Sequence, residues 1–129
     1  MISFQAFRQT DGTPIYLQII RYIQQGLAAG TIRDSDELPS RRVVSALLAV
    51  NPNTVQKAFR LLEDEGLVTS RAGAKSYIQA TPEQIAALRR ALLETEMQAM
   101  VDAARRMGLT REEAHRLLDT LYDKEGTDA

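Results

Sequence analysis

The sequence contains no cysteine and no tryptophan, and His115 is its only histidine. Without cysteine there can be no disulfide, no thiolate metal site and no cysteine nucleophile. A single histidine cannot form the paired-histidine motif of zinc hydrolases. The chain also lacks a glycine-rich phosphate loop and the serine turn of the α/β-hydrolases. These absences predict a protein that is not an enzyme and that needs neither a metal nor another cofactor.

Long apolar segments are missing as well. No uninterrupted apolar run approaches the ~18 residues that a bilayer crossing requires, and the first residues lack the charged-then-apolar layout of a signal peptide. We therefore expect a cytoplasmic protein without a membrane partner. With 129 residues, 44% of them hydrophobic, the chain is long enough for one small domain with its own core and an appendage.

The formal net charge of −1 conceals a difference between two parts of the chain. Residues 1–80 hold nine Lys and Arg against seven Asp and Glu, a net charge of +2. Residues 81–129 hold seven against ten, a net charge of −3. A basic part beside an acidic part favours a polyanionic partner for the first part alone.

Apolar residues at helical spacing predict three helices in the first part, over residues 13–29, 41–49 and 52–65. Thr13 and Asn51 each precede a proline at the first helical position, a combination that begins helices. Only about two residues separate the second helix from the third. So short a connection favours the sharp crossing of a helix-turn-helix.

Between the first and second helices, residues 31–38 are predicted to form a polar loop. After the third helix, residues 67–71 and 75–78 have the composition of two β-strands joined by a short turn. A β-hairpin directly after a helix-turn-helix is the element order of a winged helix.

Two further helices are predicted by capping boxes that begin at Thr81 and Thr110. We therefore expect a mainly α fold with a small β-hairpin. Its winged helix-turn-helix spans residues 1–80, and a two-helix segment spans residues 81–129.

The solvent face of the third helix has the chemistry of DNA recognition. Amide side chains can pair bidentately with adenine, threonine can contact bases through its hydroxyl or methyl, and cations further along suit phosphates. The alternative is that Asn51 and Asn53 only cap the helix and that its cations form a solvated face. The predicted outward residues are Asn53, Thr54, Gln56, Lys57 and Arg60.

Arg41 and Arg42 add positive charge in the first turn of the second helix. Cations there oppose the helix dipole by a few tenths of a kcal/mol, so an anion bound nearby would explain them. The alternative is an ion pair with Asp36 or Glu37.

The tip of the hairpin places Arg71 and Lys75 around Gly73, where the backbone can approach a ligand closely. This arrangement is predicted to be either a wing that contacts phosphates or a charged, solubilising turn. Three basic or amide-rich elements in this order favour nucleic acid as the partner.

Four blocks of the sequence stand out: P-I-Y-L-Q-I at 14–19, L-P-S-R-R at 38–42, N-P-N-T-V at 51–55 and E-G-L-V at 65–68. In this order, over residues 14–78, they resemble the GntR family of bacterial transcription factors. The first and third blocks, with the short C-terminal part, resemble its YtrA subfamily. The resemblance implies a dimeric winged-helix repressor, for YtrA-like members often of an operon that encodes an ABC transporter.

The resemblance also implies which residues contact DNA: Arg42, Asn51, Asn53, Thr54, Gln56 and Gly73. Two positions depart from the family pattern. Lys75 stands where the family has a second wing glycine, which changes the wing and adds a potential phosphate contact. Ser35 lies near a position where glycine is common, so the loop before the second helix is expected to differ.

The C-terminal helices are too few to enclose a ligand cavity of ~300 Å³ within one chain. They can instead present an apolar stripe to a second copy of the chain, or fold back on their own domain and complete its core. We predict a homodimer, and the sequence identifies no small-molecule effector. The predicted interface residues are Leu88, Leu92, Met97, Met100, Leu117, Leu118 and Leu121.

Together these patterns predict a sequence-specific DNA-binding transcriptional regulator that binds a palindromic operator as a dimer, with its DNA-binding domain over residues 1–80 and its dimerisation segment over residues 81–129. The resemblance to the GntR family implies that it is a repressor, and the likeness to the YtrA subfamily implies a transporter-type operon as its target. The alternative is a winged-helix protein–protein interaction module without specific DNA binding. Such a module should expose Leu, Phe or Tyr on the third helix. The amide, hydroxyl and cationic residues there favour DNA binding.

Overall fold

The computed structural model describes residues 1–71 and 75–128. It contains the predicted helices and the predicted hairpin, which confirms a mainly α fold with a small sheet. The elements in chain order are α1 (Ile15–Ala29), β1 (Glu37–Leu38), α2 (Arg41–Leu48), α3 (Pro52–Asp64), β2 (Val68–Arg71), β3 (Lys75–Ile78), α4 (Pro82–Arg106) and α5 (Arg111–Asp128).

Side-chain hydrogen bonds cap the N-termini of α2 and α3. The Ser40 hydroxyl accepts a hydrogen bond of 3.1 Å from the backbone N–H of Val43. The Asn51 side-chain oxygen accepts one of 2.8 Å from the N–H of Asn53. Each cap satisfies a helix-start donor that would otherwise lack a partner. The chain can therefore end one helix and begin the next within a few residues.

The start of α1 differs from the prediction. The helix begins at Ile15, Pro14 is the N-cap residue, and no side chain caps the helix. Thr13 acts through its carbonyl instead, which accepts a 2.7 Å hydrogen bond from the side-chain amide of Gln18. The same amide group also bonds the backbone of Thr10, so Gln18 fixes the segment that leads into α1.

The sheet has the strand order β1-β3-β2, and both pairings are antiparallel. The prediction of an unbroken loop over residues 31–38 was wrong, because Glu37 and Leu38 form β1 against β3. Before β1, Ser35 adopts a left-handed φ of 72°, a conformation that glycine takes without strain. Ser35 thus holds this turn in a conformation that is uncommon for a residue with a side chain.

The N-terminal segment, which the sequence analysis did not assign, belongs to the core. Ile2, Phe4 and Phe7 are buried, and the N–H of Ile2 donates to the Glu37 carbonyl at 2.8 Å. The ring of Phe4 stacks on that of Tyr22 with a centroid distance of 5.1 Å. These contacts fasten the segment to both β1 and α1.

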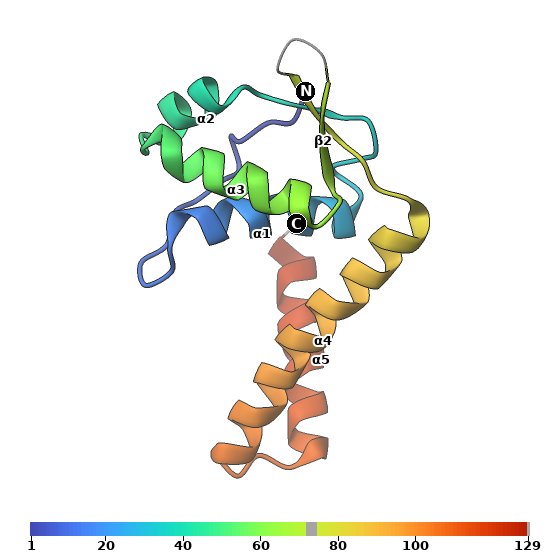
Figure 1. Ribbon diagram of the computed structural model, residues 1–129. Helices are drawn as coiled ribbons and strands as arrows, with labels where there is room; N and C mark the ends of the chain where they lie inside the picture. The colour runs from blue at the N-terminus through green and yellow to red at the C-terminus, as the bar shows by residue number, and fades with distance from the viewer. Residues whose placement is uncertain (72–74, 129) are drawn as a thin grey trace. The chain divides into compact units, whose positions relative to one another are not determined.

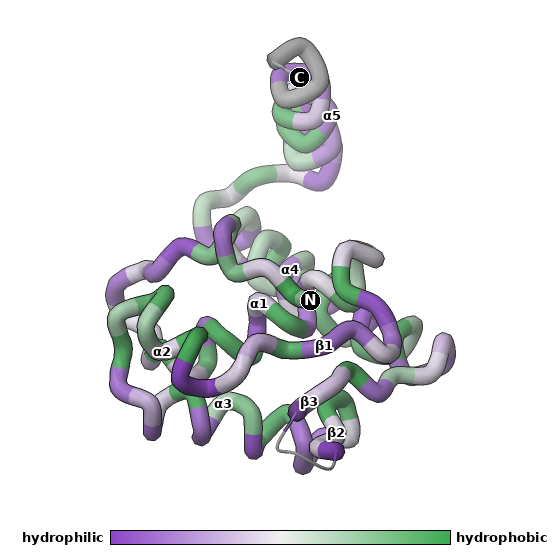
Figure 2. The backbone as a smooth tube through the Cα atoms, turned by 90° about the horizontal axis from the view of Figure 1, so that it is seen from above, coloured by the Kyte–Doolittle hydropathy of each residue, from purple (hydrophilic) through white to green (hydrophobic). Residues whose placement is uncertain are grey.

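The centre of the core lies between α1 and α3, which are side by side in Figures 1 and 2. Figure 2 shows hydrophilic and hydrophobic residues alternating along α3, as expected for a helix with one buried face. The side chains that are at most 1% exposed here are Ile19, Ile23 and Leu27 of α1 and Val55, Ala58 and Leu62 of α3.

The chain forms two compact units, Met1–Arg90 and Ala91–Ala129. The division falls within α4 instead of at the predicted boundary after residue 80. The reason is that Ile85 and Leu88, in the first turns of α4, pack against the core of the first unit. Leu88 was predicted at the dimer interface, but its side chain is already used within its own domain.

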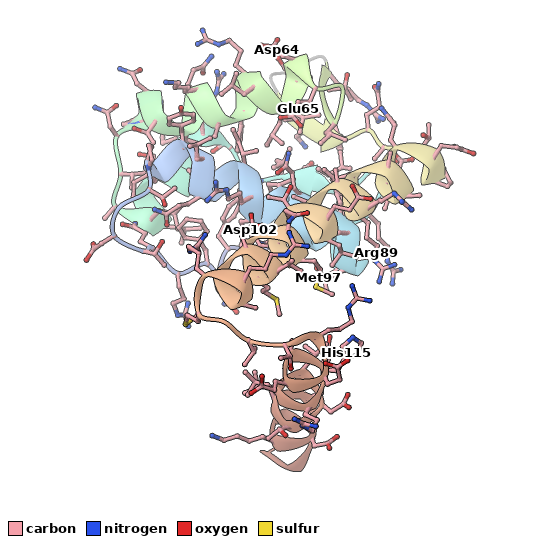
Figure 3. The ribbon with its side chains drawn as sticks, turned by 90° about the horizontal axis from the view of Figure 1, so that it is seen from below. Asp64, Glu65, Arg89, Met97, Asp102 and His115 are labelled. Carbon is pink, nitrogen blue, oxygen red and sulfur yellow. The ribbon has the colours of Figure 1, made fainter. Side chains whose placement is uncertain are left out.

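The second unit contains the rest of α4 and α5. Thr110 and Glu113 form the predicted capping box at the start of α5, and the bonds to Thr110 hold the pKa of the Glu113 carboxyl below its ordinary value. No side chain between residues 91 and 124 is buried. Met97, 51% exposed on α4, and His115, exposed on α5, are labelled in Figure 3. None of the described helices combines the length and apolar character that a membrane crossing requires.

Candidate nucleic-acid interface

The outward face of α3 is available for a ligand, as predicted from the sequence. Burial of the opposite face leaves Asn53, Gln56, Lys57 and Arg60 exposed and Thr54 half-buried. The side chains of the two asparagines have different roles in the structure. Asn51 uses its side-chain oxygen to cap the helix, whereas the side chain of Asn53 takes no part in the cap.

Arg41 and Arg42 are exposed in the first turn of α2. The alternative that they pair with neighbouring acids does not hold. The Asp36 carboxylate accepts a 2.8 Å hydrogen bond from the backbone of Arg33, and Glu37 lies beside Lys75. Among the described residues, neither arginine of α2 forms an ion pair. Both guanidinium groups are therefore free to bind an external anion.

In the hairpin, both described cations have partners within the chain. The Lys75 ammonium is 3.8 Å from the Glu37 carboxylate, and the Arg71 guanidinium lies over the ring of Tyr77 at 4.5 Å from its centre. Both cations stay exposed. Gly73, the third predicted wing residue, lies outside the described residues.

Lys57 has a partner that the sequence analysis did not identify. Its ammonium nitrogen lies 4.0 Å from the centre of the Tyr16 ring, which comes from α1. Because the two residues are far apart in the sequence, no local sequence pattern indicates their contact. Only the packing of α1 against α3 brings them together.

The helix starts of the first unit also favour an anion. The first turns of α1, α2 and α3 contain no acidic residue, whereas those of α4 and α5 carry Glu83 and the pair Glu112 and Glu113. The positive ends of the first three helices are thus not neutralised by the chain itself, so they add to the attraction that the exposed cations exert on a polyanion. Within the described part of the chain, no cluster of acidic or histidine side chains could hold a metal ion.

Comparisons with known proteins identify the family. The model of bacterial regulatory proteins of the gntR family matches residues 15–78, which span α1 to β3. The transcriptional regulator YhcF of Bacillus subtilis is 34% identical over 100 residues, which cover 78% of this chain and 83% of YhcF. The chain belongs to the GntR family of bacterial regulatory proteins.

Two further similar proteins extend the comparison. The transcriptional repressor YtrA of Bacillus subtilis is 40% identical over 68 residues, which cover 53% of this chain and only 52% of YtrA. The solved structure of a GntR family transcriptional regulator from Listeria monocytogenes aligns with a TM-score of 0.80 and 26% identity, over 87% of this chain and 98% of that one. These similarities confirm the winged-helix fold with a C-terminal helical segment.

As a GntR regulator, the protein binds DNA and is not an enzyme, as predicted from the sequence. The exposed residues of α2, α3 and the hairpin all lie within the matched region.

Neutralising Glu37 should strengthen binding of this GntR regulator to DNA. The Glu37→Gln variant releases Lys75 from its ion pair and removes a negative charge near the hairpin. Because exposed ion pairs are worth less than about 1 kcal/mol, the expected gain in affinity is about twofold. Fluorescence anisotropy with a labelled duplex measures it. Glu96→Gln, which changes the net charge equally on α4, is the control and should give no gain. An equal gain in both variants would show that only the total charge matters.

Proposed function

We propose that the protein is a sequence-specific repressor that binds a palindromic operator as a homodimer, with α3 in the major groove and the hairpin beside it. The observation that carries this proposal is the exposed face of α3, which combines amide side chains with cations and is flanked by free arginines on α2. Direct recognition of bases requires amide or guanidinium groups near the floor of the groove. Positioning of the protein on the duplex requires cations that reach the phosphates.

Asn53 and Gln56 are the proposed base-reading residues. They lie three positions apart, so they are neighbours on the helix surface and belong to its first turns. Their side chains are exposed, and the cap leaves the Asn53 amide free. Lys57 and Arg60 follow further along α3, where a helix in the groove passes close to the phosphate backbone.

Arg42 and the hairpin cations are proposed to hold the helix in register. Arg42 comes from α2, and Arg71 and Lys75 come from the two strands of the hairpin. Phosphate contacts from separate elements on either side of α3 would fix its orientation without reading sequence. The bacterial chromosome is the DNA such a protein would bind, so we place it in the cytoplasm.

The homodimer is proposed because the second unit has no core of its own. No side chain between residues 91 and 124 is buried. Helices whose apolar side chains are at most half-buried gain little stability from their own packing, so these need a partner. The exposed apolar side chains of α4 and α5 would supply the interface: Leu93, Met97, Met100, Val101, Leu117, Leu121 and Tyr122.

Repression is proposed from the similarity to YtrA of Bacillus subtilis, which is named a repressor. A dimer on its operator excludes other proteins from the same stretch of DNA. The resemblance to YtrA-like regulators makes a transporter operon the proposed target.

Selection of bound duplexes from a random pool tests the proposal. The enriched sequences should contain an inverted repeat whose half-site centres lie about one helical turn, ~34 Å, or a multiple of it apart. As a control, the spacing is changed by about half a turn, which should abolish binding by the dimer because one recognition helix then faces the wrong side of the duplex. Enrichment of a single, asymmetric site would contradict the dimeric arrangement.

A further inference from the structure

Two cations of the candidate interface lie against tyrosine rings. The Lys57 ammonium is 4.0 Å from the centre of the Tyr16 ring, and the Arg71 guanidinium is 4.5 Å from the centre of the Tyr77 ring. Both distances are well within the ~6 Å over which a ring face attracts a cation. The cations belong to different elements, and so do the rings, which come from α1 and β3.

The fold produces each contact by a different route. Tyr16 lies one turn before Ile20, which is buried, and Lys57 directly precedes Ala58, which is buried on α3. The packing of α1 on α3 therefore sets the Tyr16 ring beside the Lys57 side chain. In the hairpin, Tyr77 pairs with Thr69, so Arg71 is its diagonal neighbour across the two strands. Aromatic and long side chains reach that far.

We propose that Tyr16 and Tyr77 are positioning residues that hold Lys57 and Arg71 ready for the DNA phosphates. The inference rests on the proposed interface and adds to it two residues that the sequence analysis did not include. A free lysine or arginine samples many rotamers, and the entropy lost when it binds a phosphate lowers the affinity. A ring that already restricts the cation in the free protein reduces this loss.

The position of each tyrosine supports this role. Both are half-buried, so the ring is fixed by its surroundings while the cation beside it stays exposed. In the part of the chain that the structure describes, the Tyr16 hydroxyl makes no hydrogen bond, whereas the Tyr22 hydroxyl donates to the Ser3 carbonyl at 2.6 Å. The contact that Tyr16 offers is thus the face of its ring. Phenylalanine would preserve this ring and leucine would remove it while keeping an apolar side chain.

The test measures binding to a labelled duplex of arbitrary sequence, because phosphate contacts do not depend on sequence. Tyr16→Phe and Tyr16→Leu are compared in the wild-type chain and in a Lys57→Met background, at several salt concentrations. Tyr16→Leu should weaken binding about two- to fivefold, because Lys57 would then lose more side-chain entropy when it binds its phosphate. Its slope of log affinity against log salt should equal that of the wild type, because Lys57 still reaches its phosphate. Tyr16→Phe should bind like the wild type.

Lys57→Met separates the positioning role from the interface itself. It should lower the salt slope by about 0.9, the value for one lost phosphate contact, and Tyr16→Leu should then have no additional effect. If Lys57→Met changes neither affinity nor slope, Lys57 is not part of the interface, and the proposed function and this inference both fail at that position. If Lys57→Met weakens binding and Tyr16→Leu does not, only the positioning role is wrong.

Two other outcomes would also overturn the positioning role. A loss in Tyr16→Phe as large as in Tyr16→Leu would show that the hydroxyl contacts DNA directly. A loss in Tyr16→Leu that persists in the Lys57→Met background, together with a lower melting temperature, would show a purely structural role. Tyr77→Leu, tested with and without Arg71→Met, repeats the experiment independently at the hairpin and should give the same pattern.

Discussion

The Met100→Glu/Leu121→Glu double variant should be monomeric and should bind the operator about 100-fold more weakly than the wild type, or weaker still. Met100 and Leu121 are 52% and 51% exposed, so about half of each side chain is available to a second copy of the chain. In a dimer each glutamate would place an unpaired charge in an apolar interface, which is strongly unfavourable. A monomer binds one half-site only and loses the avidity of ~10²–10⁴ that two linked contacts provide.

Sedimentation equilibrium at micromolar concentration measures the oligomeric state, and anisotropy with the selected operator measures the affinity. Thr95→Glu is the matched control, because Thr95 is an exposed, polar residue of α4 whose hydroxyl bonds only the Ala91 carbonyl of the same helix. This variant should remain a dimer. We also expect the double variant to lose helical circular dichroism, since the exposed apolar side chains of the second unit then have no partner. A dimer that survives both glutamates would show that copies of the chain associate elsewhere.

Local signals were sufficient to predict the helix-turn-helix. Ser40 and Asn51 are cap residues whose hydrogen bonds reach only two or three positions along the chain, so sequence spacing alone indicates them. The capping boxes at Thr81 and Thr110 are equally local, and the structure contains both. The outward face of α3 follows from the same periodicity, because the buried positions Val55 and Leu62 determine which side chains face the solvent.

Contacts between distant segments could not be predicted in this way. β1 is only two residues long, too short for an alternating pattern, and exists because Ile2 and β3 bond to its backbone. The pairing of Lys57 with Tyr16 likewise depends on how α1 packs on α3. Leu88 shows the same limit: it continues an apolar stripe, and only the fold reveals that this part of the stripe packs on its own domain. Periodicity indicates which side of a helix is apolar but not which partner covers it.

Gln56→Ala should weaken binding to the selected operator by about 5- to 150-fold and leave binding to a duplex of arbitrary sequence almost unchanged. A bidentate amide–adenine pair is worth about 1–3 kcal/mol of discrimination, and that energy is absent on the wrong sequence. Gln56 is exposed and carries no charge, so its removal should not alter the salt dependence on either duplex. Titration of both duplexes over a range of salt concentrations measures the two effects separately.

Arg60→Ala is the control for this prediction, because Arg60 is exposed on the same helix but is proposed to contact phosphate. It should weaken binding to both duplexes by the same factor and lower the salt slope by about 0.9. The two variants therefore differ in which duplex they affect and in whether the slope changes. If Gln56→Ala weakened both duplexes equally, Gln56 would not read a base, and Asn53 would be the remaining candidate on α3. If neither Gln56→Ala nor Asn53→Ala affected discrimination, specificity would have to come from the hairpin, from Arg42, or from the deformability of the operator itself.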